Sequence, residues 1–448
     1  MGVRIGAAAA WSGDRIAPAD LLIEGGDLDY LMFDSMSEAT MSGAQIQRGE
    51  DPTLPGYDPW IERRLRPILG KCRDRSVRII SNQGWLDPAG GARQLADWAR
   101  EDGIVGMQLA SVAANSLFGD AGSLGLRIVE TGELLSDRMD DIVSIEPYLG
   151  AWEIAGALGH GADVVLTSRV TDASLALGPL VHELGWGRSD WDSLARGVVV
   201  GHLLECGTQV TGGNFADPGY LDVEGLADLG HPIAEVDSER AFISKVTGTG
   251  GLVSVATCKA QLLWEVGDPA RYIGPDVIAD FTDVWFSGAG LNSVEVLGGR
   301  GAPPPDVLKA LVGMREGFFS EEMVVYAGPG ALDRARLAEE ILRERLRALH
   351  FNQDEMRFDY VGLNSVHREA TPPSGSEPYE AVLRLAARAR SRSEISKLAE
   401  AVAPMAVSGP TGTGKWGTLG NRVRPVVGMY STLVPRDAVA ITTEYFKS

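Results

Sequence analysis

Short apolar runs alternate with amphipathic segments through the first half of the chain. Each run ends in small or polar residues, and helical spacing of apolar positions follows, as in 92–102 and 151–161. Strands that are apolar throughout are typical of a parallel sheet covered by helices on both faces. The pattern therefore predicts an α/β fold with a mainly parallel sheet of βα units, and six strands favour an open doubly wound sheet over a barrel. The predicted strands are 3–10, 28–35, 77–84, 104–112, 142–150 and 162–169.

The pattern changes near residue 240. Apolar and polar residues alternate across 277–299, and a Gly-Ala-Gly turn within this stretch indicates a hairpin. We therefore predict two domains, an α/β domain over 1–240 and an α+β domain over 241–448 that packs against it. The other elements expected in the second half are a long helix at 331–349, a strand at 358–366, a helix at 379–402 and closing strands at 422–446.

Polar side chains gather where the predicted strands end. Ligands of α/β proteins bind beyond the carboxyl ends of the strands, so these positions are candidates for a site. The Arg169 guanidinium could hold a carboxylate with two hydrogen bonds. Asp172 is a catalytic candidate, although charge compensation at a helix start would also explain it. Three further residues are candidates for substrate binding: Asp34, Asn82 and Tyr148.

The segment 202–215 has the highest density of side chains that could take part in catalysis. On a helix, His202 and Glu205 would share a face, and Glu205 is a candidate for proton transfer. Cys206 is either a nucleophile or a buried core residue, depending on what its surroundings do to the pKa of its thiol. Asn214 is a candidate hydrogen-bond donor to substrate.

A glycine-rich turn follows Lys245. Gly250 and Gly251 permit close approach of the backbone, and the lysine could hold a phosphate or carboxylate as a point charge. A surface turn with a solvated lysine explains the same pattern equally well. The segment 409–416 imitates a phosphate loop, but Trp416 stands where a hydroxyl residue is needed.

Charge and composition narrow the classes of partner. The chain has 61 acidic and 41 basic residues, a net charge of −20, which disfavours a nucleic-acid partner. Three scattered cysteines indicate a cytoplasmic protein without disulfides. No apolar stretch is long enough to span a membrane. The six histidines show no metal-binding spacing, so we expect no metal site, and no cofactor is indicated.

Motifs occur in order along the chain at 28–34, 37–41, 161–169, 180–186, 201–207, 211–215, 244–251, 276–277, 280–282, 298–301 and 433–436. Together they resemble the acyclic terpene utilisation AtuA family. The resemblance implies a role near acyl-CoA metabolism of branched chains, so a CoA thioester is one candidate substrate. Departures from the family pattern at 82–85 and 146–148 lie among the predicted strand ends, where we expect the ligand to bind, and they favour a substrate different from that of other members. The small ferredoxin-like domain that some members append is not expected.

These observations lead to one function hypothesis and two alternatives. We expect an enzyme that performs a lyase or hydratase step on a small branched carboxylate or its CoA thioester. Glu205 would be the acid or base, Arg169 and Lys245 would hold an anion, and these residues would share one crevice with Cys206. The alternatives are a non-catalytic acyl-CoA-binding or scaffold subunit and an acyl transferase that uses Cys206. We expect a homo-oligomer on general grounds.

Overall fold

The computed structural model describes residues 2–115, 117–352, 355–372, 378–416 and 423–448, without the side chains of residues 415 and 416. The chain divides into two compact units. Unit 1 consists of Met1–Gly313 and Met429–Ser448, and unit 2 consists of Met314–Gly428. The boundary expected at 240/241 instead falls inside unit 1, between strands β7 and β8, which pair along their whole lengths.

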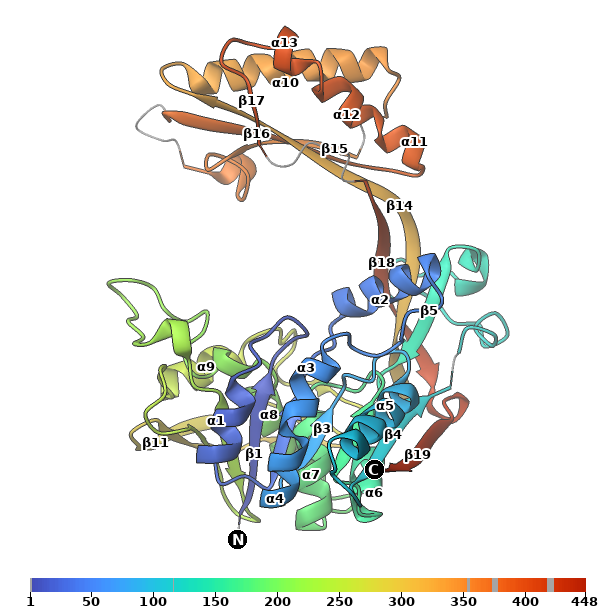
Figure 1. Cartoon of the computed structure of the whole chain (residues 1–448), viewed down its shortest axis with the longest axis vertical. Helices are drawn as coiled ribbons and strands as arrows, with labels where there is room; N and C mark the ends of the chain where they lie inside the picture. The colour runs from blue at the N-terminus through green and yellow to red at the C-terminus, as the bar shows by residue number, and fades with distance from the viewer. Residues whose placement is uncertain (1, 116, 353–354, 373–377, 417–422) are drawn as a thin grey trace. The chain divides into compact units, whose positions relative to one another are not determined.

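Unit 1 is built on a ten-stranded mixed sheet with the order β11-β12-β8-β7-β1-β2-β3-β6-β4-β19 (Figure 1). The five strands from β1 to β4 in this order are parallel, as the apolar runs predicted. Antiparallel strands extend the sheet on both sides, which the sequence reading did not include. The bounds are β1 Val3–Ala9, β2 Tyr30–Phe33, β3 Arg78–Ser81, β4 Gln108–Ala114, β6 Val164–Thr167, β7 Pro232–Val236, β8 Ala241–Lys245, β11 Trp285–Gly290, β12 Ser293–Leu297 and β19 Ile441–Lys447.

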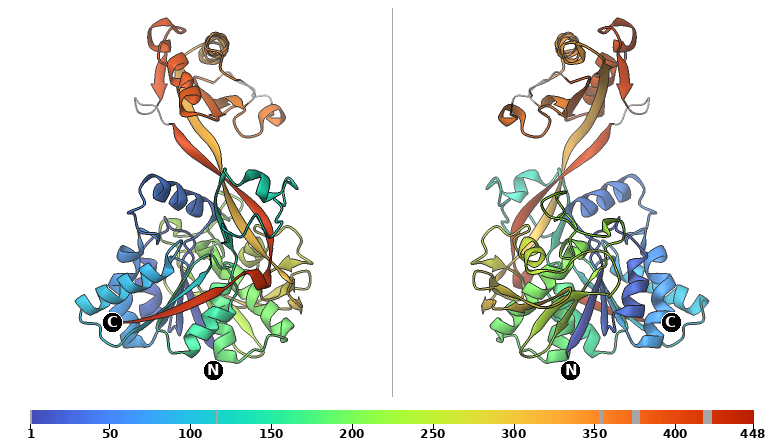
Figure 2. Two further views of the ribbon diagram at one scale, coloured as in Figure 1. Left: turned by 90° about the vertical axis from the view of Figure 1, so that its right-hand side faces the viewer. Right: turned by 90° about the vertical axis from the view of Figure 1, so that its left-hand side faces the viewer.

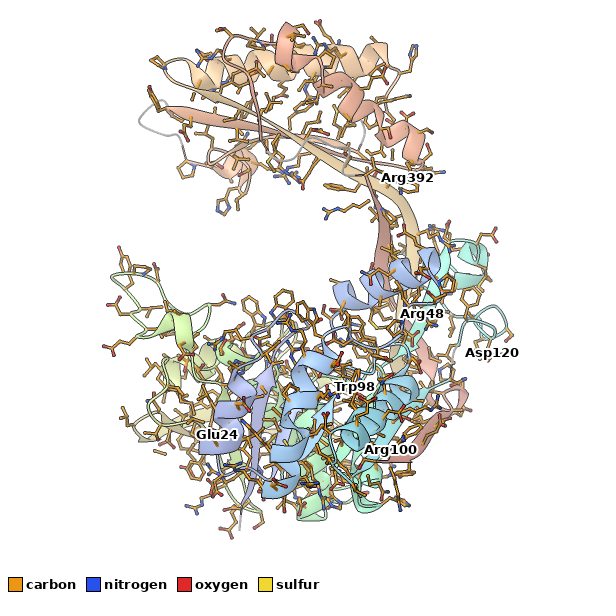
Figure 3. All side chains as sticks on the ribbon, viewed as in Figure 1. Glu24, Arg48, Trp98, Arg100, Asp120 and Arg392 are labelled. Carbon is orange, nitrogen blue, oxygen red and sulfur yellow. The ribbon has the colours of Figure 1, made fainter. Side chains whose placement is uncertain are left out.

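Helices cover both faces of this sheet (Figure 2). One core includes residues of α6, α7 and α8, and the other includes residues of α1, α3, α4 and α5. Charged side chains such as Glu24 on α1 and Arg100 on α5 lie on the outer surfaces of the helices (Figure 3). The helices are α1 Pro18–Gly25, α2 Glu38–Glu50, α3 Ile61–Leu65, α4 Leu69–Arg75, α5 Pro88–Glu101, α6 Trp152–Gly159, α7 Ser174–Leu184, α8 Trp191–Glu205 and α9 Val255–Leu262.

Smaller strands complete unit 1. A three-stranded antiparallel sheet joins β9 (Tyr272–Ile273), β10 (Ile278–Asp280) and β13 (Arg300–Ala302). The predicted hairpin forms from β11 and β12, but its turn lies at Leu291–Asn292, just after the Gly-Ala-Gly segment. Strand β5 (Ile142–Pro147) pairs with the long strand β14 (Val307–Ala327) instead of joining the ten-stranded sheet.

Unit 2 has the split β-α-β arrangement of a ferredoxin-like fold, although no ferredoxin-like domain is expected from the sequence, and it is inserted within the chain of unit 1. Its antiparallel sheet has the order β15-β16-β14-β17, and helix α10 and the segments from α11 to α13 supply its helical layer. The helix expected at 379–402 is wrong over its first part, which forms strand β16. The bounds are α10 Ala331–Ala348, β15 Met356–Val361, β16 Glu380–Ala389, α11 Arg392–Ile395, α12 Lys397–Val402, α13 Met405–Ser408 and β17 Gly414–Trp416, and β18 (Arg424–Pro435) pairs with β14.

Candidate functional site

The site lies where the central parallel strands of unit 1 end. Strands β2 and β3 pair in register at Phe33 and Ser81, so the residues that follow them begin at the same edge of the sheet. Strand β6 pairs with β3 and brings the segment 168–172 to this edge as well. Parallel strands that end together place their loops side by side, and this arrangement collects the polar groups described below.

Asn82 links the ends of β2 and β3. Its Nδ2 donates to Asp34 Oδ1 at 2.8 Å, and its Oδ1 accepts from the backbone N–H of Ser35 at 2.7 Å. The side chain is fully buried, so both ends of the amide are committed to the protein. Asn82 therefore holds Asp34 in place, whereas the sequence suggested that it would bind substrate.

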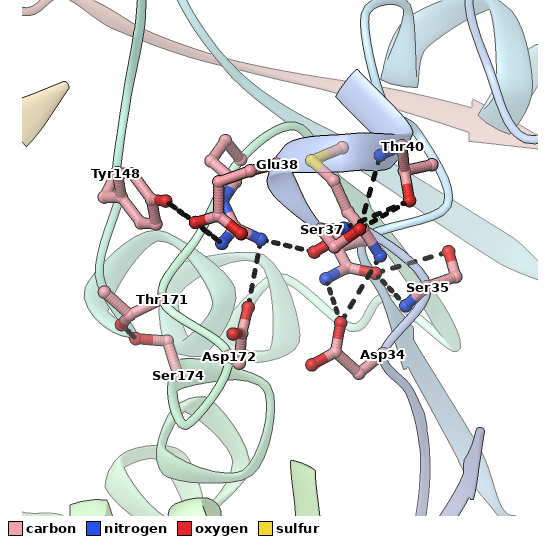
Figure 4. A network of polar contacts seen from close by, with 12 residues as sticks. Asp34, Ser35, Ser37, Glu38, Thr40, Tyr148, Thr171, Asp172 and Ser174 are labelled. Atoms are coloured by element: carbon pink, nitrogen blue, oxygen red, sulfur yellow. Dashed lines mark hydrogen bonds and ion pairs between the residues drawn. The ribbon is translucent and has the colours of Figure 1, made fainter. Parts of the chain in front are cut away.

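Arg169 contacts several members of the polar network, of which Glu38, Tyr148 and Asp172 are labelled in Figure 4. Its Nη1 donates to the Met36 carbonyl and to Asp172 Oδ1, the latter at 3.1 Å. Its Nη2 donates to Tyr148 Oη at 3.2 Å and contacts Glu38 Oε1 at 3.4 Å. The guanidinium also lies over the Tyr148 ring, with Cζ 4.4 Å from the ring centre. The side chain is only 3% exposed, and both terminal nitrogens are bonded within the protein, whereas the buried Nε has no partner among the described residues. The guanidinium therefore serves first to hold the network together.

Glu38 and Tyr148 form one side of this network. Tyr148 Oη donates to Glu38 Oε1 at 2.5 Å. Burial opposes ionisation of Glu38, but the charge of Arg169 and the bond from Tyr148 leave its pKa below the ordinary value. Glu38 opens helix α2, where the Ser37 and Thr40 side chains form a capping box. An acid in a first helical turn is ordinary, so the position of Glu38 in the sequence does not point to a role at the site.

Asp34 and Asp172 are two carboxyl groups with raised pKa values. Burial and then the charge of Asp172 raise the pKa of Asp34 well above its ordinary value. Burial raises the pKa of Asp172 to about 7, the Arg169 charge opposes this rise, and Glu205 adds to it. Carboxyl groups that share a low-dielectric site cannot all be ionised, so this pair retains a proton near neutral pH.

Glu205 reaches this edge from the end of helix α8. Gly207 (φ +52°) turns the chain beside Ala10, the residue after β1. Glu205 Oε1 lies 2.6 Å from His202 Nδ1, so the helical spacing did bring these two side chains together. Burial lowers the pKa of His202, but the charge of Glu205 and this hydrogen bond raise it above the ordinary value overall. Glu205 Oε2 is buried and has no partner among the described residues, so Glu205 affects Asp172 through its charge.

The surroundings of Cys206 disfavour a thiolate. Burial, and then the charge of Glu205, raise the pKa of the thiol to about 12. A nucleophilic cysteine needs the opposite environment, a nearby cation or a helix N-terminus that lowers its pKa. Cys206 follows the C-terminus of α8, where the helix dipole also opposes a negative charge.

The other predicted residues lie apart from this network. Lys245 donates from Nζ to the Thr249 carbonyl at 2.6 Å and lines a separate pocket, whose lining includes Gly250 and Gly251 but neither Arg169 nor Glu205. Asn214 is exposed, and its side chain contacts only Gln209, at 3.5 Å, among the described residues. The shared crevice expected for Lys245 and Glu205 is therefore not what the contacts show.

Sequence reasoning missed two features beside the network. Tyr272 lies close enough to Glu205 and Asp172 that their charges, after burial, raise the pKa of its hydroxyl. Arg64 is 1% exposed and donates to the carbonyls of Ser12 and Asp14, which fixes the loop after β1. Neither residue belongs to a motif, and only the folded chain brings them to this edge.

The part of the chain that the structure describes lacks two kinds of feature. No three histidine, cysteine or acidic side chains there are arranged to hold a metal ion. No helix there combines the length and apolar character needed to cross a bilayer.

Comparison with known proteins places the chain in one family. The model of the acyclic terpene utilisation family protein AtuA matches residues 3–445, essentially the whole chain. The protein belongs to this family, as its motifs indicated. Searches of curated proteins and of solved structures found no significant match.

Proposed function

We propose that this protein is an enzyme that moves protons on a branched acyl thioester, in a hydratase or carbon–carbon lyase step. The observation that carries the proposal is the pair Asp34 and Asp172, whose pKa values are raised at the edge of the sheet where α/β proteins bind ligands. Membership of the acyclic terpene utilisation family supports a branched acyl chain as substrate.

The charge balance of the site favours an uncharged reacting group. Four acidic side chains, Asp34, Glu38, Asp172 and Glu205, act on one another electrostatically, and Arg169 is already held by its own partners. A free carboxylate would be repelled here, whereas the carbonyl and hydroxyl groups of a thioester would not. The thioester is therefore preferred over the free acid as substrate.

The chemistry needs one carboxylate and one carboxylic acid. In hydration, the carboxylate takes a proton from water, the oxygen bonds to the β-carbon, and the acid delivers its proton to the α-carbon. In a lyase step, the carboxylate takes the proton of a β-hydroxyl group, the bond between the α- and β-carbons breaks, and the acid protonates the enolate. Two carboxyl groups with raised pKa values that act on each other through their charges can supply both forms.

Among the carboxyl groups of the network with raised pKa values, Asp172 is the one best placed to touch substrate, because Asp34 is only 5% exposed. The Asp172 side chain is 34% exposed, whereas that of Glu205 is 9% exposed and its free oxygen is buried. We assign Asp172 as the proton-transfer group, Arg169 and Asn82 as positioning residues, and Glu205 as the charge that tunes Asp172. This changes the assignment from Glu205, which the sequence favoured.

The test is turnover of a panel of branched 3-hydroxyacyl and 2-enoyl CoA thioesters by the purified full chain. For a substrate that the wild type converts, Asp172→Asn should lower kcat by about 10²- to 10⁴-fold, the usual contribution of a general acid or base. Asp97→Asn, which loses only an exposed contact to Arg100 on α5, is the control and should leave kcat unchanged. Binding of thioesters without conversion would favour the non-catalytic binding subunit, and full activity of Asp172→Asn would remove Asp172 from the chemistry.

A further inference from the structure

A pocket lies in unit 1 apart from the Asp34–Asp172 network, none of whose residues line it. It has a volume of about 450 Å³ and is formed by the end of β8, the glycine-rich loop that follows, the segment 224–225 and the turn between β11 and β12. Pockets of this size are typical of small-molecule sites. The function proposed above makes no use of it.

Lys245 is the charged group at the base of this pocket. The residue is 8% exposed, and its Nζ donates to the Thr249 carbonyl at 2.6 Å and contacts Thr249 Oγ1 at 3.3 Å. In the described part of the chain no carboxylate lies within ion-pair distance of it, and burial alone lowers the pKa of its ammonium group. Buried charges in proteins are normally paired, so an ammonium held only by neutral oxygens lacks its counter-charge.

Asn292 adds a second donor. It has left-handed backbone geometry (φ +53°) in the hairpin turn, and its Oδ1 accepts from the backbone N–H of Val253 at 3.0 Å. This contact leaves the side-chain NH₂ group without a partner among the described residues. Both residues line the pocket, so Lys245 and Asn292 can donate hydrogen bonds to a ligand there without any rearrangement of the backbone.

The glycines build the pocket wall and are not themselves anion donors. The N–H groups of Gly250 and Gly251 donate to the carbonyls of Asp228 and Glu224. A Cβ atom on Gly250 would lie 2.3 Å from the Gly225 carbonyl oxygen, so only glycine permits this contact. The glycines thus allow two loops to pack against each other, with Lys245 facing the pocket. Gly250 and Gly251 shape the pocket wall, whereas the sequence suggested that they would contact the ligand directly.

We propose that the Lys245 pocket binds a phosphate group, either free or carried by a larger ligand. A point charge on a flexible stem beside neutral donors suits the tetrahedral oxygens of phosphate, whereas planar carboxylates are best matched by the fork of an arginine. Glu224 also lines the pocket, but it is exposed, and its side chain can turn toward solvent when an anion is bound. The phosphates of a nucleotide-bearing acyl thioester are one source of such a group.

Calorimetric titration of the full chain with inorganic phosphate and with adenosine 3′,5′-bisphosphate tests the proposal, and adenosine is the uncharged control. Wild type should bind the phosphate-bearing probes and not adenosine. Lys245→Met should weaken binding about 10- to 100-fold, as expected for loss of a charged hydrogen bond. Lys259→Met, at an exposed position on the neighbouring helix α9, should bind as wild type does.

Two further variants keep the proposal testable if the Lys245→Met variant fails to fold. Asn292→Asp keeps the acceptor for Val253 but places a negative charge at the pocket, so it should weaken phosphate binding, and Glu224→Gln should strengthen it. Tighter binding of the bisphosphate than of phosphate would identify a nucleotide-bearing ligand, and equal binding would identify free phosphate. The proposal is overturned if wild type binds neither probe in the millimolar range or if Lys245→Met binds both as well as wild type. Because the readout is binding, this outcome is independent of whether the enzyme turns over a thioester.

Discussion

At the scale of single residues, the site is defined by carboxyl groups whose environments differ. Asp172 keeps part of its surface accessible yet has a pKa of about 7, because burial and Glu205 outweigh the opposing charge of Arg169. Glu38, which is bonded to Tyr148 and lies near Arg169, has a lowered pKa. Acidic groups whose pKa values are pushed apart are a mark of acid–base sites. The network thus has a physical reason to hold both a carboxylate and a carboxylic acid.

Cys206 should not take part in covalent chemistry. With a thiol pKa of about 12, almost none of it is thiolate near neutral pH, so Cys206→Ala should keep kcat within about threefold of wild type. Intact-mass spectrometry after incubation with an acyl-CoA should show an unmodified chain. An acyl adduct that disappears in Cys206→Ala would restore the acyl-transfer alternative.

Individual site residues were only partly readable from the sequence. Asp34, Tyr148, Arg169 and Asp172 stood out because they follow apolar strands, and the structure brings them into one network. Their roles were not readable, because Arg169 looks the same in sequence whether its donors are free or occupied. Tyr272 gave no signal at all, since its place beside Glu205 depends on contacts between distant segments.

At the scale of secondary-structure elements, the close contact of α7 and α8 positions Glu205. Gly201 on α8 packs directly on the chain just before α7, where a Cβ atom would lie 2.4 Å from the Ala173 carbonyl oxygen. The backbone oxygen cannot move aside without shifting the start of α7. The position of Glu205, four residues further along α8, therefore depends on a glycine.

Gly201→Ala should destabilise the protein by about 1–3 kcal/mol, the usual cost of overpacking a core. Gly156→Ala on α6 is the matched control, because its Cβ atom would meet nothing within 4 Å and alanine is the better helix former by roughly 0.5–1 kcal/mol. Thermal unfolding should show a lower Tm for Gly201→Ala and an unchanged or higher Tm for Gly156→Ala. Equal Tm values for the two variants would show that the α7–α8 contact is not tight.

Strand β16 shows why one element was misread. Its sequence, EAVLRLAARA, is rich in alanine, leucine and arginine, which favour a helix locally. In the fold it lies between β14 and β15, and hydrogen bonds on both edges outweigh this preference. By contrast, the apolar strands of the parallel sheet were readable, because burial on both faces leaves a continuous apolar run.

At the scale of the whole molecule, two compact units form from three stretches of chain. Unit 2 is inserted into unit 1, which resumes at Met429 and adds β19 to the sheet beside β4. A boundary is expected from sequence where composition changes, and the change near residue 240 marks only the switch from parallel to antiparallel pairing. The insertion of unit 2 is not marked by a change in composition, because strand β14 continues from one unit into the other.

We expect Asp172 to carry a proton in the folded chain near neutral pH, as the proposed proton transfer requires. The pKa of about 7 lies above the ordinary value of 3.8, so between these values the folded state holds a proton that the unfolded state has lost. This proton stabilises the folded state fully below pH 3.8, and the stabilisation declines as the pH rises and is lost above about 7. Asp172→Asn removes this pH dependence.

Infrared difference spectra of wild type minus Asp172→Asn, recorded across pH 4 to 9 on the full chain, test this claim most directly. We predict a carboxylic acid signal that disappears with a midpoint near pH 7 and is absent from the difference between wild type and Asp97→Asn. A carboxylate signal already complete at pH 5 would contradict the account, because Asp172 would then hold no proton to exchange with substrate.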